Sequence, residues 1–221
     1  MPVRPPPAPP ARGPVAPGAR GAARPVPSAA MSEEQHRALQ GEAVALEAEA
    51  HRALLAGDAV AARDGLRAAS DRYRASWDAA PPDAYGRLVG MVKAAVLAGE
   101  GTTAARFVRS AIPEPPPSPT AAYALAIAAL VEGDDDLAAR CAEVMRGGSE
   151  AFGRAAEAIA GLAGRDSGAY RPAVEAIVAD FAARDDHLTG VAIADTALML
   201  ERLAAGRGLA AKVASPLMPS A

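Results

Sequence analysis

The chain is poor in lysine, in aromatic residues and in clustered positive charge. Of its 23 basic residues only two, Lys93 and Lys212, are lysines. Together with the excess of alanine, glycine and proline, this bias towards arginine is typical of a high-GC bacterial genome. The net charge is -3, and no group of basic residues has aromatic residues interleaved with it. We therefore expect no nucleic-acid partner, because such binders carry a basic face.

Cysteines and long hydrophobic runs are equally scarce. The single Cys141 cannot form an internal disulfide, and it falls among small apolar residues of a predicted helix at 134–145. We expect it to be a small buried thiol, since a reactive thiol needs an exposed, electropositive setting. No stretch approaches the roughly 20 apolar residues of a membrane span. These absences predict a soluble, cytoplasmic protein without a membrane partner.

Alanine dominates the apolar half of the composition, and it is the best helix former. A short phrase also recurs along the chain: an apolar residue, a glycine, an acidic or polar residue, and then an Ala-Arg or Tyr-Arg pair. A glycine there can end one helix in the left-handed conformation, and the acid can cap the next helix. The phrase thus predicts a helical hairpin. Its four copies begin at Leu54, Leu97, Leu130 and Leu162.

Apolar residues at three- and four-residue spacing predict about nine helices, hence an all-α fold. We expect Pro82 in the first turn of the third helix, and the fifth helix, after Ser118-Pro119, to be the most buried. Pro172 should be tolerated only within a first turn of the eighth helix. The expected helices lie at 32–57, 58–81, 82–98, 102–112, 119–131, 134–145, 149–162, a stretch after Gly164 that ends near 181 and has an ambiguous start, and 191–205.

The N-terminal residues 1–30 form a separate segment. They contain ten prolines, four arginines and no acidic residue, and we expect them to be disordered. The sequence from Met31 reads like a native start, a methionine followed by a Ser-x-x-Gln capping box, so residues 1–30 are predicted to be absent from the native protein. Residues 31–221 would then be one helical-repeat domain with a net charge of -7.

The four turn glycines, Gly57, Gly99, Gly133 and Gly164, are 42, 34 and 31 residues apart. Helical-hairpin solenoids repeat every 34 to 47 residues or so. The recurring phrase resembles tetratricopeptide-like repeats over about 39–183, although the period is irregular. That resemblance implies a stack of antiparallel hairpins acting as a non-enzymatic protein-binding adaptor or scaffold.

Two other functions stay open. The stretch 190–216 resembles the ending of some helical bacterial toxin-immunity proteins, which implies neutralisation of a toxin by direct binding. A small-molecule binder or enzyme with a pocket between helices is the third alternative, opposed by the lack of any visible convergent set of polar residues.

The sequence shows no constellation for catalysis, and we predict no enzymatic activity, no cofactor and no metal. Glu47 and His51 lie four residues apart, but no histidine or cysteine completes a three-ligand zinc site, so we interpret them as an ordinary surface pair. The run 185–187 (Asp-Asp-His) is interpreted as a solvated loop, and 134–136 (Asp-Asp-Asp) as a helix N-cap. The segment 99–103 lacks the lysine of a phosphate-binding loop.

Arginines at equivalent points of the four hairpins are the candidate partner-binding residues. Aligned in a stack, they would present planar donor groups to an acidic protein partner. The alternative is a set of surface ion pairs, for which two of the four have an acid at four-residue spacing. These residues are Arg63, Arg106, Arg140 and Arg171.

Overall fold

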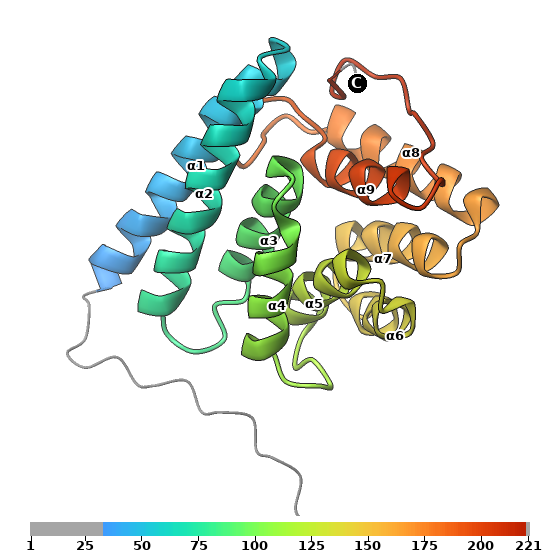
Figure 1. Ribbon diagram of the computed structural model, residues 1–221, viewed down its shortest axis with the longest axis horizontal. Coiled ribbons are helices and arrows are strands. Elements are labelled where there is room, and N and C mark those ends of the chain that lie inside the picture. The colour runs from blue at the N-terminus through green and yellow to red at the C-terminus, as the bar shows by residue number, and fades with distance from the viewer. Residues whose placement is uncertain (1–32, 220–221) are drawn as a thin grey trace, which may run out of the picture.

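Figure 1 shows the computed structural model, which describes residues 33–219. This range is helical and contains no strand, so the all-α prediction is confirmed. The predictions for residues 1–30 and for a start at Met31 lie outside the described residues. The helices are α1 (Glu33–Leu55), α2 (Ala59–Ala79), α3 (Gly86–Ala98), α4 (Gly101–Ala111), α5 (Pro119–Glu132), α6 (Asp135–Met145), α7 (Glu150–Ala163), α8 (Ser167–Ala182) and α9 (Asp195–Ala205).

Each helix from α1 to α8 packs against the next one along the chain, and α3, α5 and α7 also contact one another in a row. The last helix departs from this order, because α9 returns to lie against α3, α7 and α8. A linear repeat array contacts only its neighbours, so α9 is a closing element rather than another repeat. One main core cluster includes buried residues from all nine helices.

Two arginines fasten this closing segment to the ends of earlier helices. Arg202 of α9 donates to the carbonyl of Leu97 at 2.8 Å, and Arg207 donates to the carbonyl of Leu130 at 2.7 Å. Both carbonyls belong to the last turns of their helices, α3 and α5, where backbone acceptors have no intrahelical partner. Arginines at these positions satisfy the carbonyls and favour the negative ends of the helix dipoles.

At three of the four hairpin turns the glycine is left-handed as predicted, and at two of these the acid that follows caps the next helix, whereas Glu100 makes no side-chain cap. Gly57, Gly99 and Gly133 have positive φ, and the side chains of Asp58 and Asp134 accept from backbone N–H groups of the following helices. At the fourth turn Gly164 stays in the helical region (φ −75°), and Arg165 takes the left-handed conformation (φ +52°). The 6→1 hydrogen bond there runs from Asp166 to Gly161, so the turn is displaced by one residue.

Three predicted helix positions need correction. The third helix begins at Gly86 rather than Pro82, because Asp83 adopts positive φ (+68°) and Tyr85 stacks on Trp77 with centroids 5.7 Å apart. The eighth helix begins well before Pro172, since the Asp166 side chain caps it. The ninth helix begins at Asp195, and the residues before it, from 191, form a loop.

Other predictions from helical periodicity are confirmed. Ten of the fourteen residues of α5 are buried, and Ser118 caps this helix with Pro119 in its first turn. Cys141 is fully buried, and burial raises the pKa of its thiol to about 11. Within the described residues, no helix combines the length and apolarity needed to cross a bilayer.

The crossing of α7 and α8 requires a glycine at position 161. A Cβ atom there would lie 2.8 Å from the backbone nitrogen of Tyr170, whereas a Cβ at Gly153 of the same helix meets nothing within 4 Å. We expect Gly161→Ala to lower the free energy of unfolding by about 1–3 kcal/mol, as overpacking does. Gly153→Ala should raise it by up to about 1 kcal/mol. Urea unfolding of both variants checks this, and equal effects would contradict it.

The buried thiol predicts low reactivity. At pH 8 the native protein should react with an aromatic disulfide reagent far more slowly than the protein unfolded in guanidinium, because Cys141 is inaccessible and stays protonated. The absorbance of the released aromatic thiolate measures the rate of labelling. Rapid labelling of the folded protein would show that α6 opens readily.

Candidate functional site

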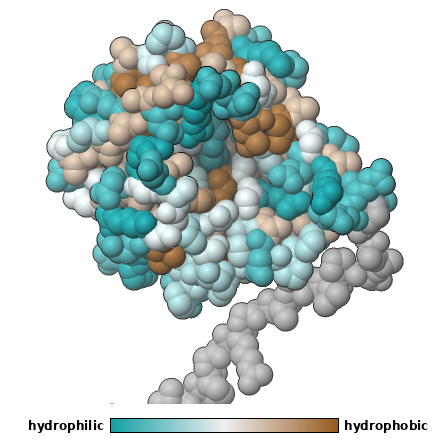
Figure 2. Space-filling model, turned by 180° about the vertical axis from the view of Figure 1, so that it is seen from behind, coloured by the Kyte–Doolittle hydropathy of each residue, from teal (hydrophilic) through white to brown (hydrophobic). Residues whose placement is uncertain are grey.

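A cavity of about 340 Å³ lies among the odd-numbered helices α1, α3, α5 and α7, the end of α8, and the start of α9. Figure 2 shows a hollow in the middle of the rear face, with hydrophobic and hydrophilic residues around it. We call this cavity the central pocket. Its apolar lining includes Val89, Phe152, Ile177, Phe181, Leu188 and Val191.

The loop 183–194 forms one wall of the central pocket. It leaves α8, crosses to α1 and returns to α9 (Figure 1). His187 stacks on Phe181 with ring centroids 6.1 Å apart, and Thr189 Oγ1 lies 3.2 Å from Nδ1 of His51. Val191 and Ile193 are buried in a small cluster with Ala48 of α1. The loop therefore covers a face of α1 that would otherwise be exposed.

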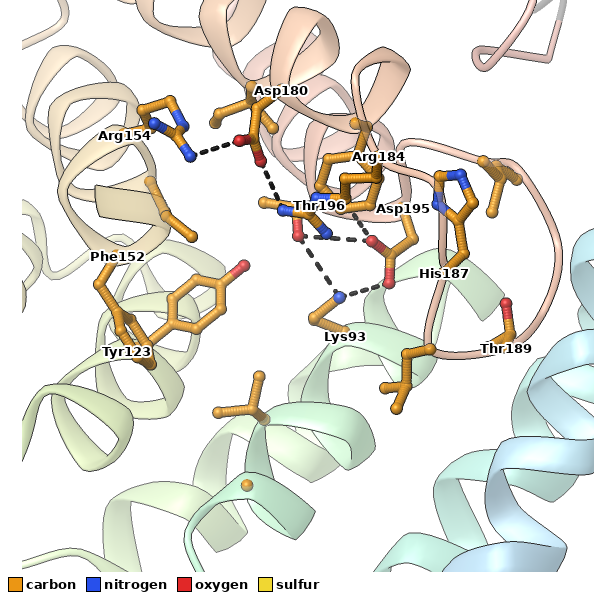
Figure 3. A pocket seen from close by; sticks show the side chains of 18 of the residues that line it. Lys93, Tyr123, Phe152, Arg154, Asp180, Arg184, His187, Thr189, Asp195 and Thr196 are labelled. Carbon is orange, nitrogen blue, oxygen red and sulfur yellow. Dashed lines mark hydrogen bonds and ion pairs between the residues drawn. The ribbon is translucent and has the colours of Figure 1, made fainter. Parts of the chain in front are cut away.

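The floor of the pocket carries an ion pair between Lys93 of α3 and Asp195 of α9 (Figure 3). Both side chains are nearly buried, with exposed fractions of 12% and 14%. Burial alone would lower the pKa of Lys93, but the Asp195 carboxylate raises it overall. For Asp195, burial raises the pKa, but the ammonium of Lys93 lowers it more, so that the pKa is lowered overall. Both groups are thus charged near neutral pH.

A tyrosine adds a hydrogen-bond donor to this floor. The hydroxyl of Tyr123 points into the cavity beside Thr196 (Figure 3). It is buried and makes no hydrogen bond of good geometry with any described residue. Burial raises its pKa, so the phenol stays protonated. Thr196 is the neighbouring side chain that comes near to serving as its acceptor, and its hydroxyl lowers the pKa of Tyr123 against the larger effect of burial. The phenol can therefore also donate to a water or to a ligand atom in the cavity.

At the rim, two arginines share one carboxylate. Arg154 of α7 and Arg184 each donate to Asp180 at 2.5 Å. The Arg184 guanidinium also lies 3.9 Å from the centroid of the Phe181 ring. Leu188, next to this group, is 81% exposed. Arg154 also lies 3.4 Å from Glu150, which is largely exposed. The rim therefore combines two guanidinium groups and two carboxylates with exposed apolar surface.

Glu47 and His51 are not the surface pair that the sequence indicated. Their exposed fractions are 2% and 1%, because the loop 183–194 and α9 cover this part of α1. Glu47 accepts a 2.7 Å hydrogen bond from the Tyr73 hydroxyl, and His51 Nε2 lies 3.9 Å from Glu47 Oε1. Burial raises the pKa of Glu47 and lowers that of His51 to about 4.

Asp195 joins this pair. One ligand-type atom from each of Glu47, His51 and Asp195 lies within 4.8 Å of the others. Asp195, far along the chain, is not among the third ligands expected from the sequence, which were histidine or cysteine. No sequence signal identifies Asp195, because the predicted ninth helix begins at 191 and places this residue inside its second turn.

The four arginines predicted to bind a partner lie elsewhere. Each is exposed, and they come one each from α2, α4, α6 and α8; none lines the central pocket. Arg140 is 3.8 Å from Glu114, and Arg171 is 3.6 Å from Glu175, the acid four residues later. Their role in binding stays a prediction. The set is Arg63, Arg106, Arg140 and Arg171.

The remaining candidates behave as capping and loop residues. Asp134 caps α6 and receives a 2.7 Å hydrogen bond from Arg109. Asp185 and Asp186 are exposed in the loop, while His187 is half-buried beside the pocket.

Comparisons with protein-family models, with curated proteins and with solved structures found no match to this chain. Its function has to be inferred from the side chains themselves.

The floor ion pair predicts a specific pattern of stability. Lys93→Met should lower the free energy of unfolding by about 3–5 kcal/mol, because it leaves the Asp195 carboxylate buried without a counter-charge. The double variant Lys93→Met/Asp195→Asn should recover much of this loss. Urea unfolding of the wild type, both single variants and the double variant tests it; additive losses would mean that the two side chains do not interact.

Proposed function

We propose that this chain is a non-enzymatic helical-hairpin binding module, of tetratricopeptide-like arrangement, that takes an acidic and partly apolar segment of a protein partner in the central pocket. The observation that carries the proposal is the rim group in which Arg154 and Arg184 share Asp180. Arg154 also lies 3.4 Å from Glu150, whose side chain is 93% exposed, so that this second pair is open to exchange with a carboxylate of a partner. The donors of Arg184 that Asp180 does not use are available as well, and charge-assisted bonds of this kind are the stronger ones.

The lining of the pocket suits the rest of such a segment. Phe152 and Phe181 offer an apolar surface next to the arginines, and the Tyr123 hydroxyl offers a donor deeper inside. The exposed Leu188 extends the apolar surface beyond the rim. This combination favours a ligand larger than the cavity, with one part inserted and another part lying across the face of the odd-numbered helices.

Binding rather than catalysis is favoured by the state of the polar groups. Lys93 is held protonated by Asp195, so it does not serve as a base or a nucleophile near neutral pH. The phenol of Tyr123 is likewise held neutral by burial. A toxin, as the resemblance to immunity proteins implies, is one class of partner within this proposal.

A second candidate is a free small organic acid. The cavity volume, about 340 Å³, lies within the range of roughly 300–1,000 Å³ for small-molecule sites. The same rim arginines would hold its carboxylate.

A displayed random-peptide library selected on the purified protein tests the proposal. We expect the selected peptides to carry an acidic residue next to a bulky apolar one. Fluorescence anisotropy measures the affinity for a selected peptide. The double variant Arg154→Gln/Arg184→Gln should bind this peptide at least tenfold more weakly, because it loses charge-assisted hydrogen bonds worth about 1.5–3 kcal/mol. Glutamine keeps a donor for Asp180 and so limits structural damage.

The matched control is Arg63→Gln/Arg106→Gln, which removes the same charge from α2 and α4. Affinity unchanged within twofold in this control supports the pocket as the site. If Arg63→Gln/Arg106→Gln weakened binding and Arg154→Gln/Arg184→Gln did not, the partner would bind at the repeated arginines instead. Binding of a panel of small aliphatic and aromatic acids, without selection of any peptide, would favour the second candidate.

A further inference from the structure

The cluster of Glu47, His51 and Asp195 has the organisation of a metal site. Its three side chains come from two helices, α1 and α9, and their ligand-type atoms converge within 4.8 Å. Glu47 and His51 are almost completely buried, and His51 and Asp195 also line the central pocket. The cluster is thus enclosed by protein at Glu47 and borders the cavity at His51 and Asp195.

Each of the three side chains also contacts another residue. Tyr73 donates to Oε2 of Glu47 at 2.7 Å, and Thr189 Oγ1 lies 3.2 Å from Nδ1 of His51. Asp195 receives Lys93 on Oδ2, and the Thr196 backbone N–H on Oδ1 at 2.6 Å. Outer partners of this kind orient the ligands of metal sites. Oδ1 of Asp195 also accepts from the Thr196 hydroxyl at 3.4 Å, so Oδ2 is the oxygen that keeps a free lone pair beside its bond from Lys93.

A further observation that points to a metal ligand is the state of the Nε2 atom of His51. Nε2 is buried, has no hydrogen-bond partner among the described residues, and faces Oε1 of Glu47 at 3.9 Å. This distance is too long for a hydrogen bond. Two ligands each about 2.1 Å from a tetrahedral ion are about 3.4 Å apart, so a shift of about 0.5 Å would bring Glu47 and His51 into coordination. The Asp195 oxygen, within 4.8 Å of both, would have to approach by up to about 1.4 Å.

We propose that Glu47, His51 and Asp195 bind a divalent first-row transition-metal ion such as Zn²⁺, with its open coordination position directed to the central pocket. The imidazole nitrogen favours this class over Mg²⁺ and Ca²⁺, which prefer oxygen ligands alone. Three protein ligands with a vacant fourth position are the usual arrangement of a site that also meets a ligand or water. The site is independent of the rim arginines that carry the proposed function.

Lys93 is the group that opposes the ion. Its ammonium contacts Asp195 and lies 3.4 Å from Thr196 Oγ1. This positive charge already balances part of the negative charge of Glu47 and Asp195. With Glu47 and Asp195 ionised and a divalent ion bound, the floor would carry one net positive charge. Removing Lys93 should therefore strengthen metal binding.

The test uses the full chain with any affinity tag removed and with metals stripped by a chelator. Isothermal titration with Zn²⁺ should show one ion per chain, and Co²⁺ should give a visible d–d spectrum. His51→Gln should weaken Zn²⁺ binding at least a hundredfold. The matched control is His36→Gln on the same helix, another buried histidine with an unpaired Nε2, which should bind Zn²⁺ like the wild type.

Two further variants keep the test decisive if His51→Gln fails to fold. Thr189→Val, in the loop, should weaken binding roughly 10–100-fold by releasing Nδ1 of His51. Zn²⁺ should raise the thermal midpoint of Lys93→Met more than that of the wild type, since the ion replaces the missing charge. Equal Zn²⁺ uptake by the wild type and His51→Gln, or no Zn²⁺ effect on Lys93→Met, would overturn the proposal.

Discussion

The buried ion pair between Lys93 and Asp195 is the interaction on which the site depends. It joins α3 to α9 across half of the chain, at a depth where either charge alone would be strongly unfavourable. Arg202 and Arg207 reinforce the same junction by donating to the ends of α3 and α5. Together these contacts hold α9 against the row of odd-numbered helices.

The return of α9 has a geometrical consequence. To reach its place, the chain has to cross from α8 to α1, and the loop 183–194 makes that crossing. The crossing encloses the central pocket and buries Glu47 and His51. Glu47 also packs against Tyr73 of α2, and the loop adds the contact of Thr189 with His51.

Around the pocket, polar atoms that are buried without a partner are concentrated. They include the Tyr123 hydroxyl, His51 Nε2 and His187 Nδ1. Native proteins satisfy nearly all such atoms, so these positions suit ordered water or the polar atoms of a bound molecule. The rim arginines and the floor cluster use different atoms. An acidic segment at the rim and a metal ion at the floor would therefore occupy separate parts of one pocket.

Much of the local structure was predictable from the sequence, and the reason is that helices and turns are decided by neighbouring residues. The caps at Asp58 and Asp134, the most buried helix and the buried Cys141 all follow from short-range patterns. The displaced turn at Arg165 marks the limit of this approach, because a left-handed arginine has no distinctive local signal.

The sequence by itself determined the helical class, the order of the hairpins and most of their ends, since periodicity and capping act within a few residues. Only the tertiary structure decided where α9 lies, and hence that Glu47, His51, Lys93 and Asp195 meet. Contacts between residues so far apart in the chain depend on how whole helices pack, and spacing along one helix contains no information about them.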